Sequence, residues 1–343
     1  MRLLPVQEAV GMVLGHDMTE IIPGEHKKVA FKKGHIITEE EIPRFLNMGK
    51  EHIFIMEFNE GDLHENDAAI RMAKAAAGKG VTFSEPKEGK VSLLSKYPGL
   101  LKVNYRALDD INSVDDIMFA TLHTNQLVEG NTVIAGTRII PLVTKEEKIK
   151  SIERICSDNY PIVQVLPLQN KKVGIVTTGN EVFYKRIEDK FGPVIRSKFD
   201  KLGCTVEKQV FAKDDSEYIA ASIKSLIEEG VELITVTGGM SVDPDDVTPL
   251  GIKKAGADIV SYGAPTLPGA MFLLSYINDI PVLGLPGCVM YNKITIFDLV
   301  IPRLLAGEKV TKNDIVKLGH GGMCLQCKEC RYPNCSFGKG GLY

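Results

Sequence analysis

A chain of 343 residues is longer than a single hydrophobic core normally serves, so we expect two or three domains. Its net charge of −3 provides no basic field for nucleic acid, and its 44% hydrophobic residues are ordinary for a globular protein. No apolar run is long enough to cross a bilayer, and Gln7 and Glu8 interrupt the start before a signal-peptide core could form. We therefore expect a cytoplasmic protein that binds neither nucleic acid nor a membrane.

Short strands and helices are predicted at the start of the chain. Lys28–Phe31 and His52–Ile55 are strand-like runs, and Thr38 is placed to cap a helix whose first turn is acidic. An alanine-rich helix follows, for which Asn66 or Asp67 is the expected cap.

The next segment predicts small strands and a connector helix. Val91–Leu94 and Leu100–Val103 are short apolar runs, and Asn131–Val143 is typical of two strands joined by a glycine turn. The charged segment from Thr144 has isoleucines on one helical face, as a connector helix would. We expect residues 1–165 to form an N-terminal α+β domain that includes this helix.

From Lys172 onward, strands and helices alternate. The pattern predicts strands at Val173–Val176, Val206–Val210, Leu233–Val236 and Pro281–Leu283, and helices at Phe191–Leu202, Ser216–Glu229 and Asn292–Leu305. Such alternation gives a parallel sheet with helices on both faces, so we expect a three-layer αβα domain at residues 166–310. Ligands of such sheets bind beyond the carboxyl ends of the strands.

The segment Val231–Pro249 is the leading candidate for a ligand site. Its strand ends at Gly238 and Gly239, where the missing side chains allow positive φ and let an anion reach the N–H groups. Ser241 and three aspartates follow, and Thr248 begins a helix. A phosphate on the glycines, with amine donors on the acids, would suit this loop, although such turns also occur for packing alone.

The run Thr237–Val242, followed by Asp245–Pro249, resembles the signature of the molybdopterin-binding domain superfamily. That superfamily includes molybdopterin adenylyltransferases, molybdopterin molybdenumtransferases, the related domains of gephyrin and the competence/damage-inducible family. The resemblance implies that the two glycines and Asp246 hold the pterin and its phosphate. It also implies a homo-oligomer.

Two other loops carry partial matches to the same superfamily. Thr178–Glu181 supplies the family glutamate as Glu181, while Asn180 stands in place of an acid. Asp214 and Asp215 match an acid pair that follows the second strand. Asp215 is also placed to cap the next helix, and both roles remain open.

The chain departs from the superfamily at two places. Leu285–Gly287 resembles a Leu-Pro-Gly-Asn-Pro turn, but Cys288 and Val289 replace its last two residues. The stretch Leu267–Met271 lacks the lysine of the Pro-Gly-Lys-Pro element seen in molybdenumtransferases. Because a cation near a phosphate or oxyanion favours both binding and transfer, its loss affects molybdate insertion more than pterin binding.

These loops define the predicted site. Asp246 and Glu181 are the candidate catalytic residues. The candidate cofactor-binding residues are Thr178, Gly179, Asp215, Gly238, Gly239, Ser241, Asp245, Asp246, Pro286 and Gly287.

The implied function is binding of molybdopterin or adenylated molybdopterin in molybdenum cofactor biosynthesis. As an enzyme resembling a molybdenumtransferase, the protein would transfer molybdate to the pterin dithiolene or act on its nucleotide, with Mg²⁺ arranged by Asp246 and Glu181. Two alternatives stay open: a non-catalytic carrier or sensor that serves a client molybdoenzyme, and an ADP-ribose-type pyrophosphatase. Molybdenum and tungsten fit the pattern equally.

Four of the seven cysteines gather near the carboxyl terminus. Cys324, Cys327, Cys330 and Cys335 follow a Cys-x₂-Cys-x₂-Cys-x₄-Cys spacing. Closely spaced thiols in a reducing compartment favour a metal site over disulfides. We expect residues 311–343 to form a Cys-rich tail that binds either an iron–sulfur cluster or Zn²⁺.

Overall fold

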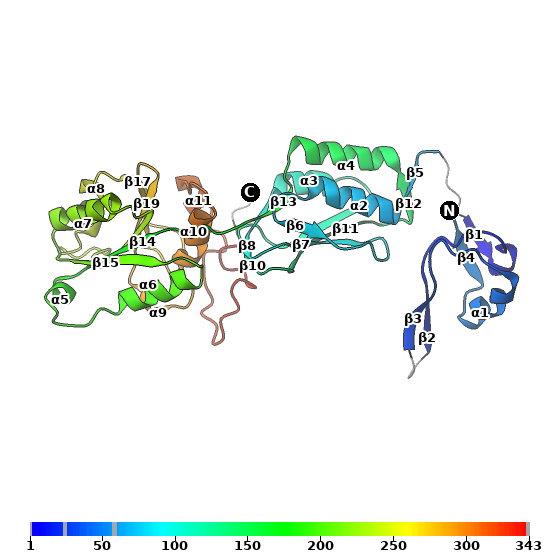
Figure 1. Cartoon of the computed structure of the whole chain (residues 1–343), viewed down its shortest axis with the longest axis horizontal. Coiled ribbons are helices and arrows are strands. Elements are labelled where there is room, and N and C mark those ends of the chain that lie inside the picture. Colours follow the sequence, from blue (N-terminus) through cyan, green and yellow to red (C-terminus); the bar gives the residue numbers. More distant parts are fainter. Residues whose placement is uncertain (1, 23–25, 57–59, 341–343) are drawn as a thin grey trace. The chain divides into compact units, whose positions relative to one another are not determined.

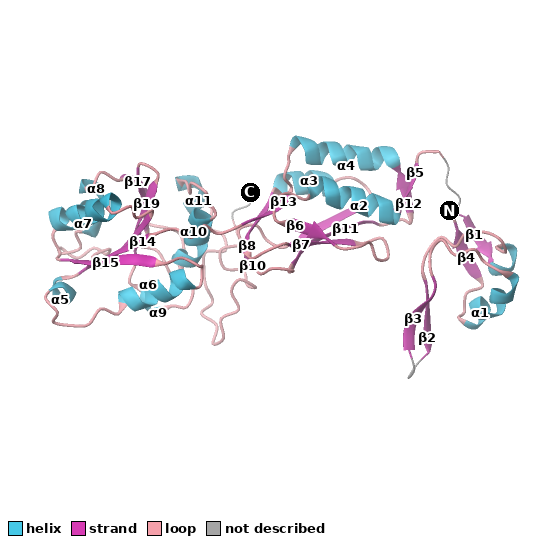
Figure 2. Ribbon diagram, in the orientation of Figure 1, coloured by secondary structure: helices cyan, strands magenta, loops and turns pink. Residues whose placement is uncertain are grey.

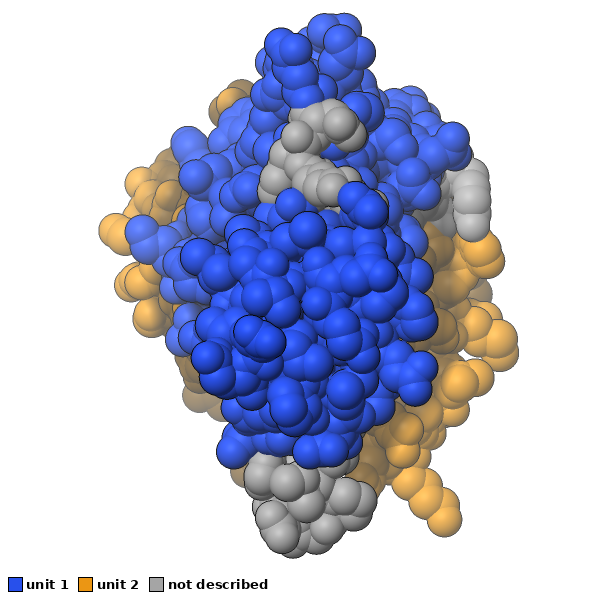
Figure 3. Space-filling view, turned by 90° about the vertical axis from the view of Figure 1, so that its right-hand side faces the viewer, with its two compact units in different colours: residues 1–97, 101–122, 128–165 blue, residues 98–100, 123–127, 166–343 orange. Residues whose placement is uncertain are grey.

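The computed structural model describes residues 2–22, 26–56 and 60–340 (Figure 1). The chain divides into two compact units (Figure 3). Unit 1 comprises residues 1–97, 101–122 and 128–165, and unit 2 comprises residues 98–100, 123–127 and 166–343.

The first part of unit 1 is two antiparallel strand pairs with a small core of its own. Strand β1 (Arg2–Pro5) pairs with β4 (His52–Ile55), and β2 (Met18–Ile22) pairs with β3 (His26–Phe31). Two short 3₁₀ turns, η1 (Val6–Glu8) and η2 (Glu39–Glu41), and helix α1 (Ile42–Asn47) complete it. The rings of Phe31 and Phe45 stack in its core, 4.2 Å apart.

The predicted cap at Thr38 is confirmed. The Thr38 N–H donates to the Glu41 carboxylate at 3.0 Å and the Thr38 hydroxyl accepts from the backbone of Glu41, a capping box.

The rest of unit 1 packs helices against a four-stranded antiparallel sheet in the order β6-β7-β11-β9. The elements between residues 62 and 166 are β5 (Asp62–His64), α2 (Glu65–Ala76), β6 (Val81–Phe83), β7 (Val91–Ser95), β8 (Gly99–Val103), α3 (Tyr105–Asn112), β9 (Ile117–Thr121), β10 (Leu127–Val128), β11 (Val133–Ile139), β12 (Val143–Lys145), α4 (Glu146–Asp158) and β13 (Val163–Leu166). Strands β8, β10 and β13 each include residues of unit 2. The predicted connector helix is α4, and its Ile149 and Ile152 are buried.

Two local predictions are wrong in this part. Gly136 forms no turn, because it lies inside β11 and pairs with Ser92 on one side and Ala120 on the other. Hydrogen bonding along both edges keeps the strand extended through the glycine. The cap of α2 is His64, whose Nδ1 accepts from the Asn66 N–H at 3.1 Å, rather than Asn66 or Asp67.

Unit 2 is built on one six-stranded sheet in the order β15-β14-β16-β19-β18-β17. The strands are β14 (Val173–Thr178), β15 (Val206–Ala212), β16 (Leu233–Thr237), β17 (Asp258–Tyr262), β18 (Leu273–Ile277) and β19 (Ile280–Leu285). The first four in spatial order run parallel, and every residue of β14 and β16 is buried. This confirms the predicted α/β fold class.

The sheet is mixed rather than wholly parallel, because β18 runs antiparallel to both β17 and β19. Only two residues, Asn278 and Asp279, join β18 to β19, and Asn278 has a φ of +54°. A two-residue connection permits only an antiparallel hairpin.

Helices cover both faces of this sheet (Figure 2). The helices of unit 2 are α5 (Asn180–Phe183), α6 (Phe191–Asp200), α7 (Ser216–Glu228), α8 (Thr248–Lys254), α9 (Cys288–Tyr291), α10 (Ile296–Leu305) and α11 (Lys312–Val316). Side chains of α7 and α8 share one core with the sheet, and those of α6 and α10 share the other. The three layers predicted from the sequence are therefore present.

The last long helix begins later than predicted, at Ile296 instead of Asn292. Thr295 ends the preceding loop, because its hydroxyl accepts from the Phe297 N–H at 3.2 Å and its own N–H donates to Asp298 at 2.7 Å. This capping box sets the first turn of α10.

The tail is anchored on α10 by a partly buried ion pair. Arg303 contacts Asp314 at 2.8 Å and Glu308 at 2.7 Å, and Asp314 also accepts from the Thr311 hydroxyl. Burial by itself would raise the pKa of Asp314, but the bonds from Thr311 and Arg303 outweigh it and lower that pKa to about 2.

We expect Asp314→Asn to lower the free energy of unfolding by about 1–2 kcal/mol at pH 7, since the depressed pKa is a stabilisation of the charged form. Because the native pKa lies below the unfolded value of about 3.9, this loss should shrink as the pH falls from about 4 towards 2. Urea unfolding at several pH values measures it. Asp279→Asn is the control, because Asp279 pairs with Lys309 on the exposed surface. An equal effect of the two substitutions would contradict the prediction.

Candidate functional site

Three loops of unit 2 leave the sheet at one edge. Thr177 of β14 pairs with Thr237 of β16, and Thr237 pairs with Leu285 of β19. The carboxyl ends of these parallel strands are therefore level, and the segments that follow them begin side by side. This is the edge at which the sequence predicted a ligand site.

A cleft of 480 Å³ lies at this edge. Six of the predicted cofactor-binding residues line it: Gly238, Gly239, Ser241, Asp246, Pro286 and Gly287. The sequence reasoning missed other lining residues, namely Phe191, Met240, Asp243 and the loop Leu267–Met271, and it noted Cys288 without assigning it to the site.

The two glycines have the conformation that their turn requires. Gly238 has a φ of +90° and Gly239 a φ of +54°. A Cβ on Gly238 would lie 2.5 Å from the carbonyl oxygen of Thr178, and one on Gly239 would lie 2.8 Å from the hydroxyl of Thr248. The turn therefore packs directly on the end of β14 and the start of α8, which a side chain at either position would prevent.

This packing leaves a row of N–H groups without partners. Within the described residues, the N–H groups of Gly239, Met240 and Ser241 have no acceptor in the protein. A hydrogen bond to a carbonyl oxygen of the loop helps to fix it, because the Tyr262 hydroxyl donates to the Met240 carbonyl oxygen at 3.0 Å. Consecutive N–H groups in such a turn form a concavity that suits an anion.

Acidic side chains gather beside this turn. Asp246 accepts from the Asp243 N–H at 3.0 Å, which closes the loop on itself. Asp214 accepts from the Asn180 N–H at 2.8 Å, and its pKa is raised by burial and by the nearby charges of Glu181, Asp245 and Asp246.

Asp214 is therefore part of this group, although the sequence analysis selected its neighbour Asp215. The Asp215 carboxylate accepts from the Tyr218 N–H at 2.8 Å and caps α7. Because a carboxylate before a helix can point into the cap or into the site, only the structure separates the two residues.

Five predicted site residues do not line the cleft: Thr178, Gly179, Glu181, Asp215 and Asp245. Thr178 forms the floor under the glycine turn, where its hydroxyl lies 3.1 Å from that of Thr248. The Glu181 carboxylate folds back over Gly179, whose φ is +133°.

The cleft has no positive side chain among its described lining residues. Ala270 occupies the stretch in which the sequence comparison expected a lysine, and it is one of the lining residues. Among the residues that the structure describes, no group of three or more His, Cys, Asp and Glu side chains is arranged to hold a metal ion. The helices in the described ranges are also all too short or too polar to cross a membrane.

Family models match two segments of the chain. Residues 174–306 match a family described as "Probable molybdopterin binding domain", and residues 3–57 match a "Domain of unknown function". The first match spans the sheet and the glycine turn of unit 2.

Two curated relatives match parts of the chain. The molybdopterin molybdenumtransferase of Synechococcus elongatus is 26% identical over 191 residues, which are 52% of this chain and 45% of that protein. A CinA-like protein of a Mycobacterium species is 36% identical over 77 residues, which are 22% of this chain and 18% of that protein. The chain therefore covers less than half of either relative.

Two solved structures are similar to part of the chain. The molybdopterin biosynthesis enzyme MoaB from Thermus thermophilus is 19% identical with a TM-score of 0.33, over 40% of this chain and 98% of that one. The tungsten cofactor synthesizing protein MoaB from Pyrococcus furiosus is also 19% identical with a TM-score of 0.33, over 40% and 92%.

Unit 2 is an α/β domain with a cleft at the carboxyl ends of its parallel strands. Residues 174–306 form a molybdopterin-binding domain, homologous to a molybdopterin molybdenumtransferase and to CinA-like proteins. The family predicted from the Gly238 and Asp246 motifs is thereby confirmed.

We expect Gly239→Ala and Gly287→Ala to differ sharply in stability. The first forces a side chain into positive φ and against Thr248, and should cost about 1–3 kcal/mol. The second has a φ of −52° and an open space around its Cβ, so it should change stability by less than about 0.5 kcal/mol. Thermal or urea unfolding of both variants checks this. Similar losses in both would show that the glycine turn is not constrained as described.

Proposed function

We propose that the cleft binds molybdopterin or adenylated molybdopterin, and that the protein acts in molybdenum cofactor biosynthesis by inserting molybdate or delivering the cofactor. The observation that carries the proposal is the row of unpartnered N–H groups at Gly239, Met240 and Ser241. A phosphate placed there would accept from the backbone without needing a positive side chain.

The acids beside the turn would take the opposite role. A pterin ring presents N–H and amino donors, and the carboxylates of Asp243 and Asp246, which line the cleft, can accept from them. Asp246 also shapes the loop through the Asp243 N–H, so its substitution would alter both the charge and the shape of the site.

Mg²⁺ is the metal that this group of oxygens suits. After burial, the nearby charges of Glu181, Asp245 and Asp246 also raise the pKa of Asp214. Mg²⁺ prefers one or two carboxylates together with phosphate oxygens and water. We propose that Asp246 and Glu181 are the catalytic residues if the protein is an enzyme, and that they hold such an ion against the ligand's phosphate.

A non-catalytic carrier or sensor is the second candidate. It is favoured by the absence of a Lys or Arg among the described residues that line the cleft. Transfer of an oxyanion develops negative charge that a cation would normally stabilise, whereas retention of the pterin does not require one. Such a carrier would hand its ligand to a client molybdoenzyme.

An ADP-ribose-type pyrophosphatase is the third candidate. The residue sequence Asp245–Pro249 and the similarity to a CinA-like protein favour it.

We also propose that the protein forms a homo-oligomer, that it is cytoplasmic, and that its domains are residues 1–165, 166–310 and 311–343. The cysteines Cys324, Cys327, Cys330 and Cys335 are proposed to bind an iron–sulfur cluster or Zn²⁺.

Binding of molybdopterin under anaerobic conditions tests the proposal. Gly287→Val should weaken binding at least tenfold, about 1.4 kcal/mol, because its side chain would enter the open space of the cleft. Its unfolding temperature should match that of the parent protein. Gly136→Val is the control, since it places a valine inside a strand of unit 1. Undiminished binding by Gly287→Val would remove the cleft as the pterin site.

Separate incubations distinguish the three candidates. The pure protein is supplied with molybdopterin plus molybdate, with molybdopterin plus ATP, and with ADP-ribose. Molybdate incorporation supports the transferase, and pterin retention without turnover supports the carrier. AMP release from ADP-ribose supports the pyrophosphatase, and loss of any observed turnover in Asp246→Ala is expected. If no incubation gives retention or turnover, the proposed function is wrong.

A further inference from the structure

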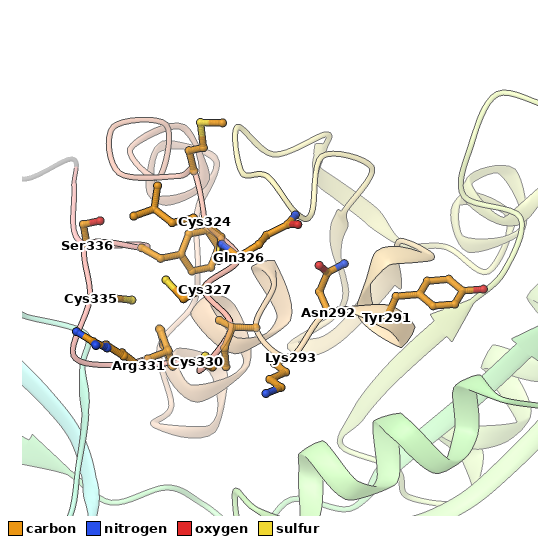
Figure 4. Close-up of a pocket in the computed structure, with 15 residues that line it drawn as sticks. Tyr291, Asn292, Lys293, Cys324, Gln326, Cys327, Cys330, Arg331, Cys335 and Ser336 are labelled. Carbon is orange, nitrogen blue, oxygen red and sulfur yellow. Dashed lines mark hydrogen bonds between the residues drawn. The ribbon is translucent and has the colours of Figure 1, made fainter.

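The four cysteines of the tail line one cavity. Cys324, Cys327, Cys330 and Cys335 surround a space of about 210 Å³ within unit 2 (Figure 4). Cys327 and Cys330 are exposed and the other two are partly buried. All four cysteines of the tail therefore border the same cavity.

This loop is held in place by packing on the α/β domain. The Tyr332 hydroxyl, between the third and fourth cysteines, donates to the Asp298 carbonyl oxygen of α10 at 3.1 Å. Phe337 is 2% exposed, and the Gly338 N–H donates to the Gly321 carbonyl oxygen at 2.9 Å. Because both ends of the loop are fixed in this way, the cavity is a feature of the folded unit.

The size of the cavity favours a guest larger than one ion. Four thiolates on Zn²⁺ must converge to sulfur–sulfur distances of about 3.8 Å, given Zn–S bonds of about 2.3 Å. No three of the described ligand-type side chains converge in that way. The cavity instead has the volume of about seven water molecules. An iron–sulfur cluster occupies the space between its four cysteine sulfurs and holds them further apart than one Zn²⁺ ion does. Cysteines that line a cavity therefore suit a cluster better than a single ion.

The surroundings also suit a negatively charged cluster. The Gln326 N–H donates to the Cys324 sulfur at 3.4 Å. Lys293 and Arg331 line the cavity and can offset negative charge. Four thiolates around a doubly positive four-iron core leave a net charge of −2, which two such cations balance.

We propose that Cys324, Cys327, Cys330 and Cys335 bind one [4Fe–4S] cluster in this cavity. When a preformed [4Fe–4S]²⁺ core is transferred from a donor that holds it through four thiolates, each cysteine sulfur forms one Fe–S bond as one donor Fe–S bond breaks. The proton of the cysteine thiol passes to the released donor thiolate, and no electron is transferred. The cluster site stands apart from the pterin proposal, since it uses none of the cleft's polar residues.

The cluster would also fix one wall of the cleft. Leu267 lines the cleft, and its N–H donates to the Gly322 carbonyl oxygen at 2.8 Å. Its own carbonyl oxygen accepts from the Cys324 N–H at 2.8 Å. A cluster bound to Cys324 would therefore restrain the loop at Leu267. Any effect of this restraint on pterin binding rests on the proposed function.

Anaerobic reconstitution of the full-length protein with equal amounts of ferrous and ferric iron, and with sulfide equal to the total iron, tests the inference. We expect four iron and four sulfide per chain, broad visible absorption and an electron paramagnetic signal after reduction. The exposed pair Cys327→Ser/Cys330→Ser should lose all of these while keeping the parent's unfolding temperature. Cys288→Ser is the matched control, because Cys288 is a partly exposed cysteine outside the cavity and should leave the cluster content unchanged.

Two irons per chain, or one zinc without visible absorption, would overturn the four-iron assignment. Full cluster content in the double serine variant would overturn the cysteine assignment. Hydrogen exchange then tests the link to the cleft, where cluster loading should slow exchange at the Leu267 and Cys324 amides, and unchanged exchange would refute it. These measurements need no pterin, so the two proposals can fail separately. Cluster binding without pterin binding would contradict only the proposed pterin site, and pterin binding without a cluster would contradict only this inference.

Discussion

The contact between the glycine turn and the end of β14 is the constraint on which unit 2 depends. Gly238 sits so close to the Thr178 carbonyl that a side chain there would push the two strand ends apart. Because β14 and β16 pair along their whole length, that displacement would propagate into the central sheet. In the same turn, the N–H groups of Gly239, Met240 and Ser241 have no partner within the described chain. Fold and site thus share one steric requirement.

The electrostatics of the cleft follow from this arrangement. Backbone N–H groups supply the positive end of the site, and aspartates supply the negative end, with no Lys or Arg among the described lining residues. A ligand with one anionic group and several neutral donors is the best match. That combination describes a phosphorylated pterin better than a nucleotide triphosphate, whose charge would need several cations.

Asp298 connects the tail to the body of unit 2. Its side chain caps α10 through Thr295 and pairs with Lys198 at 2.8 Å, while its carbonyl oxygen accepts from Tyr332. The start of one helix therefore positions the Cys-rich loop. Through Leu267 the same loop reaches the cleft, so the two candidate sites of unit 2 share part of their framework.

The sequence by itself determined the alternation of strands and helices, the glycine turn and the cysteine spacing, because each rests on local backbone preferences or residue type. It did not reveal that Asp214 accepts from the Asn180 N–H while Asp215 caps α7, since adjacent carboxylates look alike until the helix start is fixed. It also gave no sign that Gly136 lies within a strand, or that Phe191 lines the cleft. Those outcomes depend on contacts between segments far apart in the chain, which only the tertiary structure brings together.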